Sequence, residues 1–346
     1  MGAKTDAETA CEFAQYVVNR NPVIILGSGA SAAHGVPGMW PLGQMLLTAA
    51  VPGVWTSGEL TQWDAFKAEL AGGADLESAL GSIRLTEKQT DFVATETRRF
   101  LMPADLAVMS RLFADRRSLP LSRLIRHVFR SAQTAINVVT PNYDRLAEFA
   151  ADAAEFPFYT GFNPGLFQGR GRGTRQPRRA DKTVYVWKVH GSFDWFIDGA
   201  QQIVASPVVH DVPSGHTPLM VTPGIDKYRR THIEPYSSVL ANANASLQDG
   251  KAYLCVGYGF NDEHLQQKLV ERCDRDSVPL VVLTKELTPT ARTFLASGRC
   301  RSYLALEETP GGTMAYTDWK PGGFELAGVD HWGLNGFLDL VFGSGA

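Results

Sequence analysis

Two short polar motifs in this 346-residue sequence carry side chains suited to positioning water and moving a proton. Asn142 and Asp144 belong to the motif Pro-Asn-Tyr-Asp, and His190 is followed by a glycine and a serine. A neutral amide such as that of Asn142 positions a water molecule without being consumed. Histidine titrates near neutral pH and accepts a proton from water or a hydroxyl group, so His190 is the best candidate for a general base.

A glycine-rich motif near the N-terminus has the form of a phosphate-binding turn. The apolar residues 23–26 predict a buried strand, which is followed directly by Gly27, Ser28, Gly29, Ala30 and Ser31. Glycine lets backbone N–H groups approach a ligand closely, and the start of a following helix favours negative charge. The alternative is a tight strand-to-helix turn that binds nothing.

Two nucleotide chemistries fit this motif poorly. It lacks the Gly-Lys-Ser/Thr of a P-loop, which argues against a nucleotide kinase or an ATPase. The spacing Gly27-x-Gly29-x-x-Ala32 fits the loose dinucleotide fingerprint, which expects an acidic residue about 20 positions further on. The segment there offers no acidic residue before Glu59, so hydride transfer is a weak second choice.

Composition narrows the class of protein. The formal net charge is −3, so no overall positive field indicates a nucleic-acid binder. The four cysteines are scattered without a Cys-x-x-Cys pair, which predicts buried, inert thiols and no metal site. No segment approaches the roughly 18 apolar residues of a membrane span, and the N-terminus lacks an apolar signal-peptide core. We therefore expect a cytoplasmic protein that makes no membrane contact.

The elements that must position these motifs form an alternating pattern. Apolar runs at 136–139, 184–189, 252–256 and 280–283 predict further strands, with helical segments between most of them, and residues 303–306 predict an edge strand. Asp198-Gly199 predicts a hairpin turn, and Thr288 followed by Pro289 predicts the start of a helix. This alternation predicts an α/β fold with a mostly parallel sheet and helices on both faces. Ligands bind such sheets outside the carboxyl ends of the strands, so the motifs at 27–31, 142–144, 190–192 and 257–262 should converge on one crevice.

Segment 41–130 interrupts this pattern. It contains amphipathic helical stretches and no convincing strand, so we expect a helical insertion that forms a smaller lobe. The main domain then comprises residues 1–40 and 131–346. Within it, the Gly-, Arg- and Pro-rich segment 160–183 has the composition of a solvated loop.

Four motifs together resemble the sirtuin-like (Sir2-like) family. They are GSGAS with the following GVP at 27–37, PNYD at 141–144, KVHGSFDW at 188–195 and GYGFNDEHL at 257–265. The likeness is closest to bacterial sirtuin-like NAD hydrolase domains of antiphage defence, and it does not extend to the helical insertion. It implies a Rossmann-like NAD-binding domain with a smaller, variable lobe.

The resemblance also implies roles for single residues. Asn142 would order a water molecule or the ribose hydroxyls, and His190 would be the general base or the partner of a ribose hydroxyl. Asp144 would hold the nicotinamide carboxamide, and Pro37 would lie in the loop over the nicotinamide ribose. The other contacts to NAD+ would come from Gly27, Ser28, Gly29, Ala30, Ser31, Gly257, Tyr258, Gly259 and Thr284. From the residues alone, the alternatives are that Asn142 or Asp144 caps the next helix and that His190 is a hydrogen-bonded core histidine.

The implied activity is hydrolysis of NAD+ to nicotinamide and ADP-ribose, with NAD+ as substrate and no metal. An NAD-depleting effector needs an off-state, which implies a homo-oligomer or a partner such as a HerA-like ATPase or another phage sensor. Two departures from deacetylating sirtuins count against an acyl-lysine groove: no four-cysteine zinc module, and Gly38-Met39-Trp40 in place of an acidic-aromatic-arginine run. A third departure, Gly259 in place of a serine, affects the contact of that motif to NAD+. The alternatives are an NAD-dependent protein deacylase or ADP-ribosyltransferase, and a non-catalytic sensor of NAD or ADP-ribose.

Overall fold

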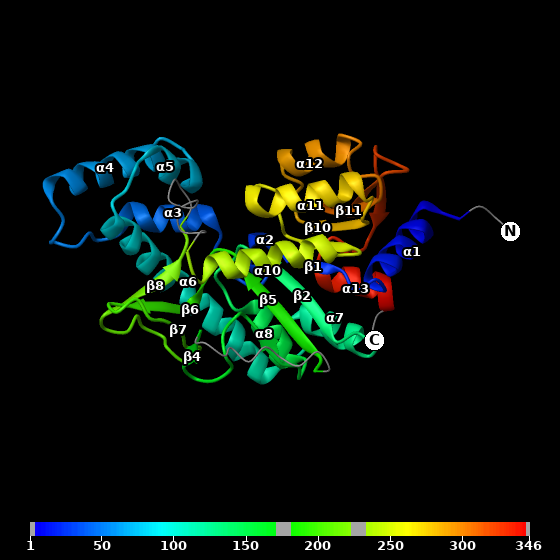
Figure 1. Ribbon diagram of the computed structural model, residues 1–346. Helices are drawn as coiled ribbons and strands as arrows, with labels where there is room; N and C mark the ends of the chain where they lie inside the picture. The colour runs from blue at the N-terminus through cyan, green and yellow to red at the C-terminus, as the bar shows by residue number, and fades with distance from the viewer. Residues whose placement is uncertain (1–3, 171–180, 223–232, 344–346) are drawn as a thin grey trace.

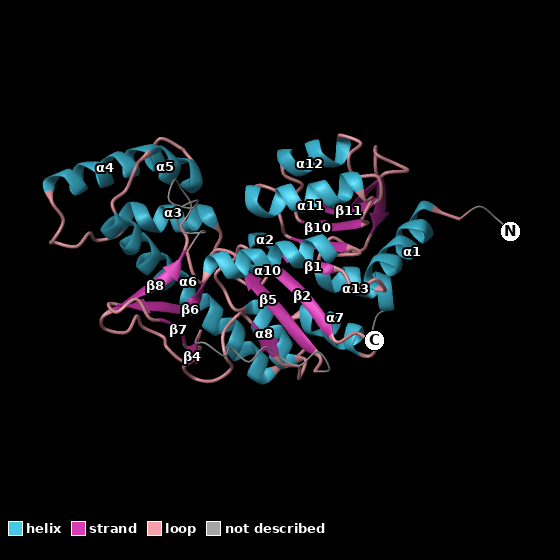
Figure 2. Ribbon diagram, viewed as in Figure 1, coloured by secondary structure: helices cyan, strands magenta, loops and turns pink. Residues whose placement is uncertain are grey.

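The computed structural model describes residues 4–170, 181–222 and 233–343, and a nine-stranded sheet lies at its centre (Figures 1 and 2). From one edge to the other, its strands are β13 (Phe324–Ala327), β12 (Gly312–Thr317), β11 (Tyr303–Thr309), β10 (Leu280–Thr284), β9 (Tyr253–Val256), β1 (Val23–Leu26), β2 (Ala135–Thr140), β5 (Thr183–Lys188) and β3 (Phe158–Tyr159). All pairs from β11 to β3 are parallel, and β12 and β13 add an antiparallel edge. The predicted α/β class with a mostly parallel sheet is confirmed.

The order of the parallel strands determines where a ligand can bind. Taken in chain order, β5-β2-β1-β9-β10-β11 is the 3-2-1-4-5-6 arrangement of doubly wound sheets. The direction of winding reverses between β1 and β9, where Ile25 pairs with Cys255 on one side and with Val139 of β2 on the other. The loops after β1 and β9 therefore flank the position at which such sheets form a crevice.

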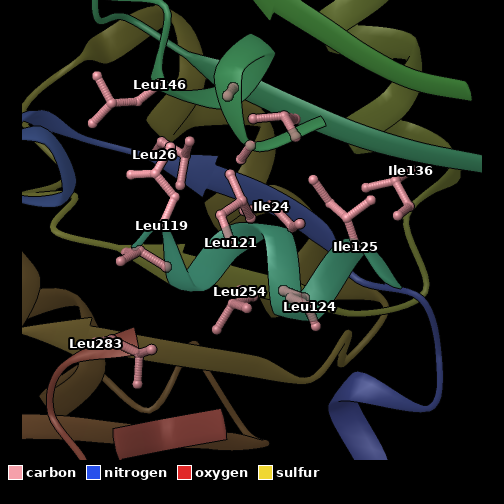
Figure 3. Close-up of a cluster of buried hydrophobic side chains, with 14 of the residues drawn as sticks. Ile24, Leu26, Leu119, Leu121, Leu124, Ile125, Ile136, Leu146, Leu254 and Leu283 are labelled. Carbon is pink, nitrogen blue, oxygen red and sulfur yellow. The ribbon is translucent and has the colours of Figure 1, made fainter. Parts of the chain in front are cut away.

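Helices cover both faces because alternate strand residues point to opposite sides. Ile24 and Leu26 belong to the core beneath α1 (Asp6–Val18), α7 (Pro120–Phe129), α8 (Leu146–Ala153) and α13 (Leu334–Phe342), part of which is drawn in Figure 3. Val23 and Ile25 belong to the opposite core, beneath α10 (Tyr236–Asp249), α11 (Glu263–Arg275) and α12 (Pro289–Ala296). Thr288 starts α12 as the sequence predicts, because its hydroxyl accepts the amide of Ala291 at 3.1 Å.

The segment 41–130 divides between two hydrophobic cores. The helices α3 (Met39–Thr48), α4 (Ser57–Ala71), α5 (Leu76–Ser82) and the start of α6 (Glu87–Ala114) enclose a separate core that includes Trp55, Trp63 and Phe66. Later residues of α6, together with α7, pack instead against the large sheet. Figure 1 shows α3, α4 and α5 apart from the sheet, with α6 leading back to it.

A small second sheet lies beside α6. Its strands are β4 (Gln168–Gly169), β7 (Ile203–Ala205), β6 (Gly191–Asp198) and β8 (His216–Met220), all paired antiparallel. Asp198 ends β6 at the turn that the sequence predicts between residues 198 and 199. The predicted edge strand at 303–306 is an inner strand, because the hairpin of β12 and β13 pairs beyond it.

Several sequence expectations concern features outside the sheet. Cys255, Cys273 and Cys300 are buried as predicted, whereas Cys11 is half-buried, and none of the four forms a disulfide. Most of the arginine-rich segment falls at 171–180, outside the described residues. Of the helices within the described ranges, none is long and apolar enough to cross a bilayer.

Three glycines hold the loops after β1 and β9 in direct backbone contact. The Gly29 amide donates to the Gly257 carbonyl at 3.1 Å, and a Cβ atom on Gly27 would lie 2.2 Å from that same oxygen. Gly257 has φ +56°, and a Cβ atom there would lie 2.2 Å from the Ala30 nitrogen. Packing of the two loops by itself accounts for glycine at these positions.

We predict that Gly257→Ala lowers the free energy of unfolding by roughly 2–5 kcal/mol, because a left-handed φ and a backbone clash add together. Gly298→Ala is the matched control, since Gly298 has φ +71° and a Cβ atom added there would meet no other atom within 4 Å. That variant should lose only about 1–2 kcal/mol. Urea denaturation compares the two, and equal losses would contradict the packing argument.

Candidate functional site

A cavity of about 1200 Å³ opens at the carboxyl ends of the central strands. The ends of β1, β9 and β10 contribute Leu26, Val256 and Leu283, and the start of α3 contributes Met39. The cavity lies at the β1–β9 reversal, where the strand order predicts a crevice. Every residue that the sequence nominated lines it: Gly27, Ser28, Gly29, Ala30, Ser31, Pro37, Asn142, Asp144, His190, Gly257, Tyr258, Gly259 and Thr284.

Asn142 is fixed to the loop after β1 by its side-chain amide. Its Nδ2 donates to the Gly27 carbonyl at 2.8 Å and to the Ser31 hydroxyl at 2.9 Å. The Ser31 hydroxyl in turn donates to Asp144 Oδ2 at 2.6 Å. Because a carbonyl can only accept, the Gly27 bond sets the amide orientation, with Nδ2 toward the loop. Both N–H groups of Asn142 are then used, and its Oδ1 is left as an acceptor.

Asp144 combines this contact with a local one. Its Oδ1 accepts the amide of Leu146, the first residue of α8, at 3.2 Å, and the residue is buried. The helix-capping explanation thus describes part of what Asp144 does, while the side chain of Asn142 makes its bonds to the β1 loop instead.

His190 forms a buried pair with Asp262. Nε2 of His190 lies 2.5 Å from Oδ2 of Asp262, and the two side chains are 8% and 9% exposed. Asp262 also caps α11 through the amide of Leu265 at 3.3 Å. A carboxylate accepts, so in the neutral imidazole Nε2 carries the proton and Nδ1 is the acceptor. Nδ1 is buried and has no hydrogen-bond partner among the described residues.

The other nominated residues form the cavity wall in different ways. The Tyr258 side chain is buried, with its hydroxyl 3.3 Å from the Asp262 carbonyl, so it supports the loop that carries Asp262. The Gly259 carbonyl accepts the Thr288 hydroxyl at 2.6 Å, which joins the same loop to the start of α12. Thr284 donates to the Glu286 carbonyl at 2.8 Å at the end of β10.

Two titratable groups near the cavity have altered pKa values. Burial and the neighbouring Arg111 lower the pKa of His34, against the opposing effect of Asp144, so His34 is neutral at pH 7. Burial raises the pKa of Tyr143, whose protonated hydroxyl donates to the Val221 carbonyl at 2.6 Å. Because it keeps its proton, the Tyr143 hydroxyl is unsuited to act as a base.

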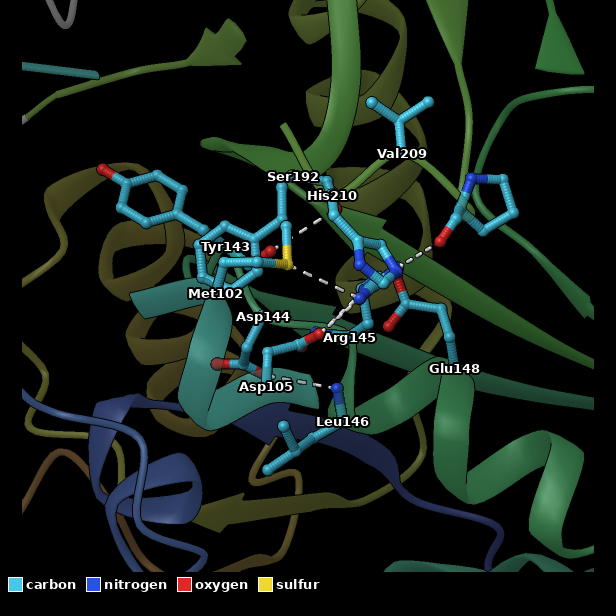
Figure 4. A network of polar contacts seen from close by, with 12 residues as sticks. Met102, Asp105, Tyr143, Asp144, Arg145, Leu146, Glu148, Ser192, Val209 and His210 are labelled. Carbon is cyan, nitrogen blue, oxygen red and sulfur yellow. Dashed lines mark hydrogen bonds and ion pairs between the residues drawn. The ribbon is translucent and has the colours of Figure 1, made fainter. Parts of the chain in front are cut away.

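A buried ion pair anchors the Asn142–Asp144 loop to α6 (Figure 4). Asp105 accepts the Arg145 backbone amide at 2.8 Å and its guanidinium at 2.6 Å, and both side chains are buried. Arg98, on the same helix, donates to the carbonyls of Phe193, Val209 and His210 at 2.6–2.7 Å. The second sheet and the site loop are therefore both tied to α6.

A second buried pair lies under the loop. Lys188 donates to the Asp144 carbonyl and to Glu148 Oε1, the latter at 3.1 Å. Burial raises the pKa of Glu148 to about 7, although the charge of Lys188 acts in the opposite direction. Neither side chain lines the cavity, and Lys188 holds Asp144 in place through its backbone carbonyl.

Sequence reasoning assigned no role to Asp262, Asp105 or Arg98. Asp262 had a detectable signal, since it stands within the quoted 257–265 motif directly before a predicted helix, in the position of a cap. Asp105 and Arg98 lie within an amphipathic helical segment that has no distinguishing motif. Their partners are about 40 and 95 residues away in the sequence, and no local pattern indicates those pairings. Among the described residues, no group of three or more His, Cys, Asp or Glu could hold a metal ion.

Comparison with known proteins yields structural likenesses only. No protein-family model matches the chain, and no curated protein matches it by sequence. It is similar to a solved structure from work on the mechanism and regulation of Sir2 enzymes, with 14% identity, a TM-score of 0.43, and coverage of 86% of this chain and 92% of that chain. A Sir2 homologue in complex with NAD has 15% identity and a TM-score of 0.40, with 88% and 89% covered. The fold class rests on the strand order itself rather than on these likenesses.

We predict that Asp105→Ala lowers the free energy of unfolding by about 3–5 kcal/mol, because it leaves the buried Arg145 guanidinium without its partner. The control is Glu12→Ala, which removes the exposed ion pair with Lys4 and should cost about 1 kcal/mol or less. Chemical denaturation gives both values. A loss for Asp105→Ala no larger than that of the control would rule out the anchoring role.

Proposed function

We propose that the chain is an NAD+ glycohydrolase that releases nicotinamide and ADP-ribose. One observation carries the proposal: an oriented amide, Asn142, and a carboxylate-held imidazole, His190, come from different strand ends and line the same cavity. The four motifs that resemble the sirtuin-like family lead to the same residues. In NAD+, the bond between C1′ of the ribose and the pyridinium nitrogen breaks, and its electron pair leaves with nicotinamide.

Asn142 has the free hydrogen-bond acceptor that is needed to orient the nucleophile. Its two N–H groups are used by Gly27 and Ser31, so only Oδ1 can meet a ligand. Oδ1 accepts a hydrogen bond from water or from a ribose hydroxyl. A group so fixed positions the acceptor with little loss of entropy at the moment of reaction.

His190 has the free nitrogen needed to accept a proton. Because Asp262 holds Nε2, the buried Nδ1 is the basic atom, and a buried acceptor without a partner among the described residues fits a group that a bound ribose or water satisfies. As the oxygen of water bonds to C1′ of the ribose, His190 takes the proton that the water loses. Asp262 then stabilises the imidazolium.

Asp144 and the paired glycine loops complete the arrangement. Asp144 is proposed to face the nicotinamide carboxamide, and residues 27–31 with 257–259 to contact the phosphates and the adenosine-side ribose. Thr284 and Pro37 would contact the two ends of the dinucleotide. Metal ligands play no part in this proposal.

The cellular role is proposed from the same resemblance. An unrestrained enzyme of this kind would deplete the cytoplasm of NAD+, so we propose an antiphage effector held inactive by self-assembly or by a partner such as a HerA-like ATPase. An NAD-dependent deacylase or ADP-ribosyltransferase would use the same cavity with another acceptor. A sensor would bind NAD+ or ADP-ribose without turnover.

We predict that His190→Ala and Asn142→Ala each lower the rate of nicotinamide release from NAD+ by about 10²-fold or more. Asp262→Asn keeps the cap of α11 and should lower the rate less, because the imidazole loses only the carboxylate that stabilises its protonated form. Release is followed by chromatography, with His216→Ala and Asn242→Ala as controls, since neither residue lines the cavity.

The alternatives give different outcomes in the same assay. Release that depends on an acylated peptide indicates a deacylase, and ADP-ribose bound to protein indicates a transferase. Tight NAD+ binding without release in every oligomeric and partner state indicates a sensor. Full activity in both His190→Ala and Asn142→Ala would contradict the site assignment.

A further inference from the structure

A pocket of about 420 Å³ lies beside α7 and α13. It has no part in the mechanism proposed above. Most of its lining residues are basic, and an aromatic ring joins them: Arg117, Arg123, Arg126, His127, Arg130 and Phe342. The chain as a whole has a formal net charge of −3, so this clustering opposes the overall charge balance. The volume falls within the range of about 300–1,000 Å³ that is typical of small-molecule sites.

The basic residues form a stripe along one face of α7. Arg123, Arg126, His127 and Arg130 are spaced three and four residues apart, which places them on neighbouring helical positions opposite the buried face of that helix. Like charges at this spacing destabilise a helix by a few tenths of a kcal/mol per pair. At the last turn of α7, the favourable interaction of Arg126 with the helix dipole offsets part of this cost.

Protein groups offset only part of this charge within the described residues. Arg123 pairs with Asp339 at 2.6 Å, and Arg126 donates to the Ala153 carbonyl, which is uncharged. For the exposed guanidinium groups of Arg117 and Arg130, no ion pair is formed with any residue in the described ranges. Two full positive charges therefore face the pocket without a carboxylate from the described part of the chain.

One wall of the pocket is rigid. His127 stacks on Phe342 with ring centroids 3.7 Å apart and an angle of 21° between the planes. This contact fixes the end of α13 against α7, and Arg123 bridges the same helices through Asp339. Arg123 and Arg126 therefore project from a helix held in place by its neighbour, which reduces the entropy lost on binding.

We propose that this pocket binds the polyphosphate group of a small anionic ligand. Planar guanidinium groups bind phosphate oxygens in pairs, and several converging arginines suit a chain of phosphates better than a single carboxylate. The proposal is independent of the function of the larger cavity. The two sites are adjacent, because Pro120 and Asn335 line both.

Calorimetric titration with inorganic tripolyphosphate tests the proposal on the full chain. Arg117→Ala/Arg130→Ala should weaken binding at least about tenfold, because each lost charge-assisted contact is worth more than a neutral hydrogen bond. Arg117→Lys/Arg130→Lys should recover only part of the affinity, since lysine keeps the charge but not the paired geometry. The control is Arg84→Ala/Arg301→Ala, which removes two other exposed arginines and changes net charge equally.

Comparing ATP with tripolyphosphate distinguishes a nucleotide ligand from a free phosphate chain. If ATP binds more tightly than tripolyphosphate and depends on the same arginines, the ligand is a nucleotide. If the two bind equally, the phosphate chain alone is recognised. Absence of saturable binding, or equal losses in the pocket variant and the control, would overturn the proposal.

Discussion

Close backbone contact between the loops after β1 and β9 is the constraint on which the candidate site depends. Gly27, Gly29 and Gly257 allow these loops to touch at the point where the strand order reverses. The contact fixes the Gly27 carbonyl and the Ser31 hydroxyl, which together orient the Asn142 amide. On the other loop, the same contact fixes the segment that leads through Tyr258 to Asp262, the partner of His190. One packing arrangement thereby places both candidate catalytic groups.

Buried ion pairs hold the site loops against the surrounding structure. Asp105 of α6 holds the backbone and guanidinium of Arg145, directly after Asp144 in the chain. Charges in such an environment are costly to bury and strongly destabilising when one partner is lost. The helix that carries Asp105 also contributes residues to the smaller core and to the large one. The segment between β1 and β2 is thus both a lobe beside the cavity and part of the support for its floor.

The sequence was sufficient to predict those elements whose local residue pattern agrees with their place in the fold. Four-residue apolar runs such as 23–26, the glycine turn after them and the Thr288-Pro289 start of α12 carry their own signals. Convergence of the polar motifs also followed, because parallel strands end at one edge of a sheet. The partners of those motifs did not follow: the Asp262–His190 and Asp105–Arg145 pairs join residues 72 and 40 positions apart, and pairing at that range depends on tertiary structure. The edge position expected for 303–306 was wrong for the same reason, since the β12–β13 hairpin adds pairing that no local signal in β11 reveals.

A crystal structure of the Asn142→Ala variant with NAD+ tests the central claim most directly, since loss of the amide should leave the dinucleotide uncleaved. The account predicts that the nicotinamide ribose lies between position 142 and His190, with a ribose hydroxyl or a water within hydrogen-bond distance of His190 Nδ1. NAD+ bound outside this cavity, or a His190 Nδ1 that meets only protein groups when NAD+ is bound, would contradict it.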